Sequence, residues 1–189
     1  MQKLELKAVA RDSFGKKASK AVRRNGQVPC IVYGGGETVH FAVGVKDLKP
    51  LIYSPNSYVV ELDIDGKKEV AVMREAQFHP VREEILHIDF YRVIEGKPVT
   101  IDLPVALEGN SEGVKVGGKL ILNKRKLTVS GLIEKLPDQL TVDITSLELG
   151  KSIFAGDLKF DGLTILTPAT TAICAVKITR AAKAAAEAE

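Results

Sequence analysis

The chain lacks most of the features that mark secreted, membrane-bound or disulfide-rich proteins. Of its 189 residues none is tryptophan, two are cysteine and 5% are aromatic. Cys30 and Cys174 lie 144 positions apart, which is neither a disulfide framework nor a metal-ligand spacing, so we expect two reduced thiols in a cytosolic protein. No apolar run approaches the roughly 18 residues of a membrane span, and the first residues do not have the apolar core of a secretion signal.

Acidic residues are scarce at one end of the chain. Residues 1–30 contain eight Lys and Arg against two acids, a net charge of +6, whereas the remaining residues carry −3. Such asymmetry predicts a polyanionic partner for the basic end. Residues 94–178 contain ten basic and ten acidic residues, and this neutrality disfavours extensive phosphate contact there.

Residues 16–24, KKASKAVRR, predict a short helix with five cations and no acid. Ala18, Ala21 and Val22 form a narrow apolar stripe at helical spacing, and Asp12 or Ser13 is the expected N-cap. Like charges on one helix repel one another, so a partner that supplies negative charge would stabilise it. Nucleic acid is the favoured partner. A merely solvated face is the alternative.

A glycine triplet follows the next predicted strand, where Tyr33 precedes Gly34 to Gly36. Glycines permit positive φ and let a phosphate or sugar approach the backbone, and a tyrosine can stack on a base. A flexible hairpin loop is the alternative interpretation. Farther along, Gly113, Gly118 and Lys119 imitate an ATP-binding loop, but Leu120 stands where Ser or Thr must hold magnesium, so we reject ATP binding.

His87 and Asp89 share the polar face of a predicted strand over residues 85–91. A hydrolase built on them would need a nucleophile motif such as GxSxG, which does not occur, and the three histidines form no credible metal-ligand set. The pair can instead hydrogen-bond riboses and base edges. Arg74 and Gln77 would lie nearby if their strand pairs with residues 85–91. A purely structural role for the pair stays open.

The pattern along the chain predicts a mainly β (α+β) protein of two domains. Asp65-Gly66 predicts a β-hairpin, and a loop is expected over 77–84. A break over 93–98 divides residues 1–93 from residues 94–178, whose short strands and regular turn signals predict an all-β sandwich or barrel. The Ala/Glu-rich residues 179–189 predict a disordered tail.

Three groups of residues occur in an order that is typical of one protein family. The first comprises Arg11, Gly15-Lys16, Ala18-Ser19, Arg23, Gly26, Pro29 and Tyr33-Gly34. The second comprises Gln77, His79-Pro80 and His87-Ile88-Asp89-Phe90. The third comprises Glu112 to Lys115, Gly117-Gly118, Leu136-Pro137, Val142-Asp143, Leu149-Gly150 and Asp157-Leu158. Over about residues 3–178 the chain thus resembles the bacterial large-subunit ribosomal protein L twenty-five family in its long form, the CTC or general stress type.

The resemblance implies a structural component of the large (50S) subunit of cytoplasmic ribosomes, not an enzyme. It implies an N-terminal antiparallel β-barrel with short flanking helices that binds 5S rRNA, followed by a C-terminal all-β domain. The implied partners are 5S rRNA and neighbouring 50S components, with no membrane, small-molecule substrate, cofactor or metal. We keep one alternative: a stress-related protein–protein adaptor that acts through the C-terminal domain.

The candidate RNA-binding residues are Arg11, Lys16, Ser19, Lys20, Arg23, Tyr33, Gly34, Gly35, Arg74, Gln77, His87 and Asp89. Two of them depart from the family pattern. Lys20 replaces an arginine and lacks its bidentate geometry, and Arg74 replaces a neutral amide, so a phosphate contact is the alternative to base reading. Asp89 is unusual beside an anion. It accepts from a base amine or a 2′-hydroxyl, or it orients His87 or an arginine.

Overall fold

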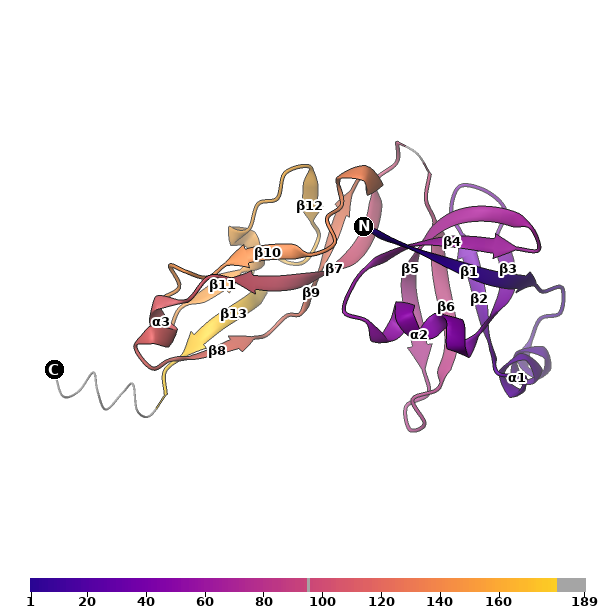
Figure 1. The fold of residues 1–189 in the computed structure, drawn as a ribbon, viewed down its shortest axis with the longest axis horizontal. Coiled ribbons are helices and arrows are strands. Elements are labelled where there is room, and N and C mark those ends of the chain that lie inside the picture. The colour runs from indigo at the N-terminus through magenta and orange to yellow at the C-terminus, as the bar shows by residue number, and fades with distance from the viewer. Residues whose placement is uncertain (95, 180–189) are drawn as a thin grey trace. The chain divides into compact units, whose positions relative to one another are not determined.

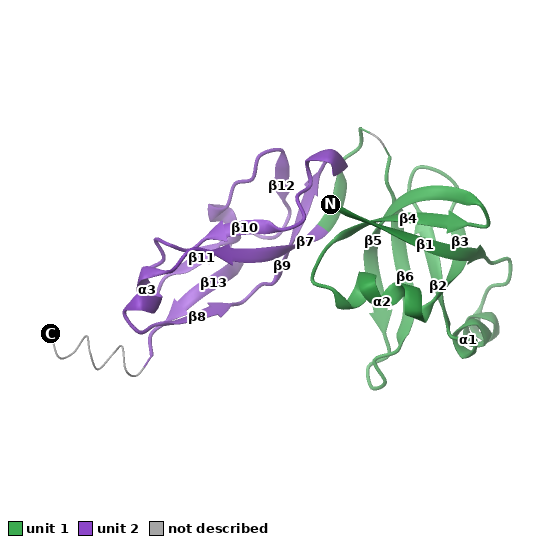
Figure 2. Ribbon diagram, in the orientation of Figure 1, with its two compact units in different colours: residues 1–101 green, residues 102–189 purple. Residues whose placement is uncertain are grey.

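The structure, a computed structural model, describes residues 1–94 and 96–179. The chain divides into two compact units, which we call unit 1 (residues 1–101) and unit 2 (residues 102–189) (Figure 2). The domain boundary expected near residue 93 stays a prediction. The tail expected over residues 179–189 lies, apart from Thr179, outside the described residues. No helix in the described part of the chain has the length and apolar character needed to cross a bilayer.

Unit 1 contains a closed six-stranded barrel (Figure 1). Its strands are β1 (Gln2–Ala10), β2 (Gln27–Tyr33), β3 (Val39–Gly44), β4 (Tyr58–Ile64), β5 (Lys67–Phe78) and β6 (Ile85–Arg92). They follow the order β1-β3-β2-β6-β5-β4, with β1–β4 and β2–β6 parallel and the other pairs antiparallel. The barrel is confirmed, although its pairing is mixed and not wholly antiparallel.

Alternation along the strands decides which side chains fill the barrel. Cys30, Phe41, Ile88 and Phe90 are almost fully buried, and the two Phe ring centroids lie 5.7 Å apart. Because successive side chains of a strand point to opposite faces, the residues between these core positions lie on the outer surface. His87, Asp89 and their cross-strand neighbours therefore face outward.

The basic helix α1 (Lys16–Arg24) has the predicted bounds and lies against β2. Its expected N-cap is wrong, because Gly15 occupies that position with φ 94° and neither Asp12 nor Ser13 makes a side-chain cap bond. The expected apolar stripe is also partly wrong. Ala18, Ser19 and Val22 are half-buried but Ala21 is exposed, since the side of the helix that faces the barrel carries Ser19 instead.

Three further segments complete unit 1. The hairpin at Asp65-Gly66 is confirmed, and both residues have positive φ, 48° and 87°, as a type I′ turn requires. The loop expected over 77–84 is two residues shorter, because Gln77 and Phe78 continue β5 and pair with β6. The second helix, α2 (Val45–Tyr53), buries Leu48 and Leu51.

Unit 2 is all β apart from short helical turns, which confirms the predicted class. Its strands are β7 (Val99–Glu108), which begins in unit 1, and β8 (Lys119–Leu122), β9 (Lys126–Gly131), β10 (Leu140–Asp143), β11 (Ser152–Phe154), β12 (Leu163–Ile165) and β13 (Ala172–Lys177). The helical turns are α3 (Glu112–Lys115), η1 (Ile133–Lys135) and η2 (Ala155–Asp157). The strands form two sheets, β10-β7-β9-β12 and β11-β13-β8.

The glycines that imitate an ATP-binding loop are explained by packing. A Cβ on Gly113 would lie 2.6 Å from the backbone nitrogen of Leu149, and one on Gly118 would lie 2.4 Å from Val176 Cγ1. Lys119 and Leu120 continue directly into β8 instead of opening a helix. Without a helix N-terminus, the backbone offers no phosphate-binding geometry of that kind.

The two thiols are expected to resist alkylation in the folded chain. Burial raises the pKa of Cys30 to about 12, and burial also raises the pKa of Cys174. At pH 8 the reactive thiolate of Cys30 is then about one molecule in 10⁴. Iodoacetamide followed by mass spectrometry should label both cysteines in guanidinium and neither in buffer within an hour. Rapid labelling of Cys30 in buffer would contradict the buried position.

Candidate nucleic-acid interface

The outer face of β5 and β6 brings three of the candidate residues together. Gln77 lies directly opposite His87, and Glu75 lies opposite Asp89, and residues opposite each other in a sheet share a face. The expected pairing of the Gln77 strand with residues 85–91 is confirmed. Glu75 was missed, although its alternation with Gln77 along β5 places it on the same face.

His87 and Asp89 form a hydrogen bond within β6. Nδ1 of His87 lies 2.7 Å from Oδ1 of Asp89, and both side chains are partly buried. A carboxylate accepts, so Nδ1 of His87 donates to Asp89, and in the neutral imidazole Nε2 is then an acceptor. Of the roles considered for Asp89, the structure thus shows the orientation of His87.

Arg23 ties the basic helix to this face. Its Nε donates to the carbonyl oxygen of Leu86, at 3.0 Å, so the last turn of α1 lies beside the start of β6. Its remaining guanidinium nitrogens make no hydrogen bond to the described residues, and the side chain is exposed. The helix cations and the His87–Asp89 pair therefore belong to one continuous surface.

The other cations of α1 project into solvent. Lys16 and Lys20 are exposed, and no acid occurs in the first turn of the helix. Lys17 and Arg24 are equally exposed and were not among the candidates. None of these four cations forms an ion pair within the described ranges 1–94 and 96–179, whereas Ser19 lies half-buried toward the barrel. The positive charge of α1 is thus not neutralised by the protein.

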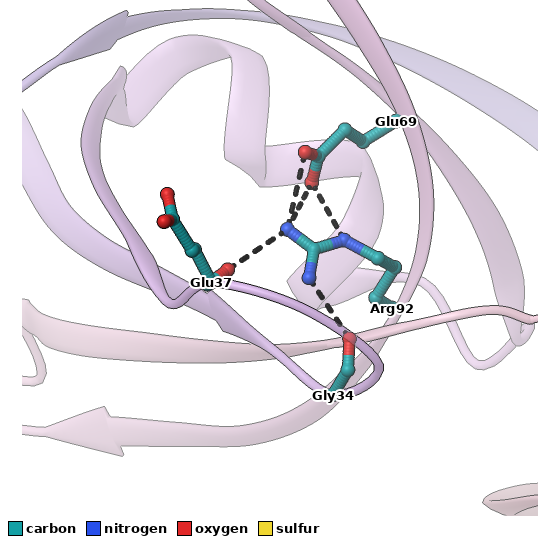
Figure 3. Close-up of polar contacts among 4 residues, drawn as sticks. All are labelled: Gly34, Glu37, Glu69 and Arg92. Carbon is teal, nitrogen blue, oxygen red and sulfur yellow. Dashed lines mark hydrogen bonds and ion pairs between the residues drawn. The ribbon is translucent and has the colours of Figure 1, made fainter.

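The glycine loop after β2 is held in place by an arginine on β6. Arg92 donates from Nη1 to the carbonyl of Gly34, at 2.9 Å, and from Nη2 to that of Glu37, at 3.2 Å (Figure 3). The same guanidinium forms a bidentate ion pair with Glu69, with N–O distances of 2.9 to 3.1 Å. These bonds favour a preformed loop over a flexible hairpin.

The glycines themselves are required by this packing. Gly34 and Gly35 have φ of 100° and 67°, and a Cβ on Gly34 would lie 2.8 Å from the ring of Tyr91. A Cβ on Gly35 would overlap Ile94. Tyr33 packs edge-on against Tyr91, with ring centroids 5.8 Å apart. The fold thus explains both glycines, and their contact with RNA stays a prediction.

The other two candidate arginines also make bonds within the chain. Arg74 lies at a β-bulge between Met73 and Glu75 and donates from Nη1 to the carbonyl of Thr100, at 3.1 Å. Arg11 donates from Nη2 to the carbonyl of Ser13, at 3.2 Å. Its Nε is buried and has no acceptor among the described residues. Both keep donors for a further partner.

The surface therefore combines unpaired cations with hydrogen-bonding side chains and an ordered glycine loop. Cations position a nucleic acid through its phosphates, and polar side chains on a strand face read the sugar and base edges. No group of three or more potential metal ligands occurs in the part of the chain that the structure describes.

Comparisons with known proteins place the chain among ribosomal proteins. Residues 6–90 match the model of the Ribosomal L25p family, and residues 98–180 match that of the ribosomal protein TL5 C-terminal domain. A protein of Bacteroides thetaiotaomicron named large ribosomal subunit protein bL25 is 48% identical over 100% of this chain and 98% of its own length. Its namesake in Porphyromonas gingivalis is 47% identical over 98% of each chain. The family is structural and non-enzymatic. The chain belongs to the Ribosomal L25p family, in the form that carries the additional TL5-type domain.

Proposed function

We propose that the chain is a structural component of the large subunit of cytoplasmic ribosomes and that unit 1 binds 5S rRNA. One observation carries the proposal: α1 presents cations without acid partners and is joined through Arg23 and Leu86 to the strand that carries His87 and Asp89. A helix of unpaired cations is stabilised when a polyanion supplies the opposite charge.

Each part of the surface has a role in the proposed complex. Lys16, Lys20 and Arg23 neutralise phosphates and fix the register of the RNA. Gln77 and the Nε2 acceptor of His87 face the wide, shallow minor groove of A-form RNA, where 2′-hydroxyls and base edges are accessible. Tyr33 and the backbone of the glycine loop complete the contact surface.

A titration of 5S rRNA against the full chain tests this proposal. The expected result at about 0.15 M salt is binding at least 100-fold tighter than to tRNA, which offers the same kind of phosphate backbone in a different fold. Equal affinity for the two RNAs would contradict it, since the contact would then be only electrostatic.

Substitution of Asp89 by Asn tests the hydrogen-bonding part of the interface. The amide can donate to Nδ1, which moves the ring proton to Nε2 and turns the outward acceptor into a donor. We expect binding about ten-fold weaker, because one hydrogen bond is lost and one buried donor is left unpaired. The dependence of affinity on salt should not change, because no phosphate contact is removed. Wild-type affinity would show that the negative charge of Asp89 is not needed for binding.

The adaptor alternative concerns unit 2, where Phe154 and Leu166 are exposed apolar side chains. Sedimentation of cell extracts distinguishes it from the ribosomal proposal. We expect stoichiometric migration with 50S particles through a high-salt wash. Migration of most of the chain as free protein would favour the adaptor.

A further inference from the structure

Phe14 is an exposed aromatic side chain beside the basic helix. It lies between β1 and α1, and 61% of its surface is accessible to solvent. One side of its ring is supported by His40 of β3, with ring centroids 4.7 Å apart and an angle of 60° between the planes. The ring is therefore positioned by the fold while most of it stays uncovered.

Basic residues flank Phe14 along the chain. The backbone nitrogen of Arg11 donates to the carbonyl of His40, at 2.9 Å, and Lys16 and Lys17 follow Phe14 in the first turn of α1. The Nε of Arg11 has no acceptor among the described residues, and Asp12 is the one acid between Arg11 and Lys20 in the sequence. The segment that carries Phe14 is thus predominantly basic.

The pairing of β3, β2 and β6 connects the position of Phe14 with the proposed interface. His40 lies opposite Ile31 of β2, and Ile31 lies beside Asp89 of β6. These three residues form one outward-facing row across β3, β2 and β6, because paired positions share a face of the sheet. Phe14 packs on His40 at one end of this row. At the other end, Asp89 is hydrogen-bonded to His87.

We propose that Phe14, supported by His40, is a stacking platform for an unpaired nucleobase of the bound RNA. The inference rests on the proposed function. Every base has an apolar π-face that stacks on an aromatic ring, and cations beside the ring hold the adjoining phosphates. An apolar protein neighbour would not require the surrounding positive charge, so the RNA is the occupant that the charges favour.

Affinity measurements with the full chain and 5S rRNA provide the first test. Phe14→Leu keeps an apolar side chain but removes the π-face, and we expect binding about five-fold weaker or more, with an unchanged salt dependence. Phe14→Trp should bind as tightly as the wild type. The matched control is Phe154→Leu, the same change at a 41% exposed position in unit 2, which should leave the affinity unchanged.

Fluorescence provides a direct readout, because the chain contains no tryptophan. In the Phe14→Trp variant the only indole reports on the platform. Saturating 5S rRNA should quench its emission and reduce its accessibility to acrylamide, since a stacked base covers the ring. An indole introduced by Phe154→Trp should keep both properties in the same complex.

The outcomes separate this inference from the proposed function. Wild-type affinity of Phe14→Leu, or an indole at position 14 that stays accessible at saturating RNA, overturns the stacking platform alone. An indole that is covered only in intact 50S particles also overturns it, because the occupant is then another component. If the wild-type chain does not distinguish 5S rRNA from tRNA, the proposed function fails and the platform fails with it.

Discussion

Replacing both Lys16 and Lys20 by Glu is expected to weaken binding of 5S rRNA about 30-fold at 0.15 M salt. Each phosphate contact releases nearly one condensed cation, so at this salt one contact contributes roughly a factor of five to the affinity. Both side chains are exposed on α1 and form no ion pair within the described residues. Their loss therefore removes phosphate contacts without breaking internal ones, and the fold should be preserved.

Salt titration distinguishes lost contacts from altered net charge. The logarithmic dependence of affinity on salt should become shallower by about two units in the double variant. The matched control is Lys46→Glu with Lys49→Glu on α2, which changes the net charge equally and also uses exposed positions. Equal losses in the two variants would show that total charge matters and that α1 does not contact the RNA.

The basic helix illustrates how far local sequence can predict this fold. Its bounds follow from propensity and from Gly26, which takes the positive φ, 73°, of the turn after it. The N-cap at Gly15 and the half-buried position of Ser19 could not be predicted from local sequence, because both depend on how α1 lies against β2. Packing between distant segments thus decided the two details that local patterns predicted wrongly.

The candidate site could likewise be predicted from the sequence only in part. Gln77 and His87 could be placed together because they lie on adjacent strands of one hairpin. The pair formed by Phe14 and His40 could not, because it depends on the pairing of β1 with β3. The glycine loop was expected to offer backbone to a ligand, yet its conformation depends on Arg92, 58 positions away from Gly34.

Because Arg92 holds the glycine loop, we expect its substitution to cause a large loss of folding stability in unit 1. Only 16% of the Arg92 side chain and 24% of the Glu69 side chain are exposed, and the guanidinium also holds two loop carbonyls. Arg92→Ala leaves Glu69 partly buried without its partner, and we expect unit 1 to lose about 3 kcal/mol of unfolding free energy. Arg92→Lys should lose part of this, since an ammonium cannot make the bidentate pair.

Tyrosine fluorescence during urea unfolding measures this loss in unit 1 alone. The chain has no tryptophan, and its four tyrosines all lie within residues 1–101. Arg82→Ala is the control: its ion pair with Glu84 is 63% and 58% exposed, so its removal should change the free energy by less than about 1 kcal/mol. If the two alanine variants unfold at the same urea concentration, Arg92 does not stabilise the barrel and the loop. If Arg92→Ala is less stable and also binds 5S rRNA more weakly under conditions where it is folded, the ordered glycine loop contributes to recognition.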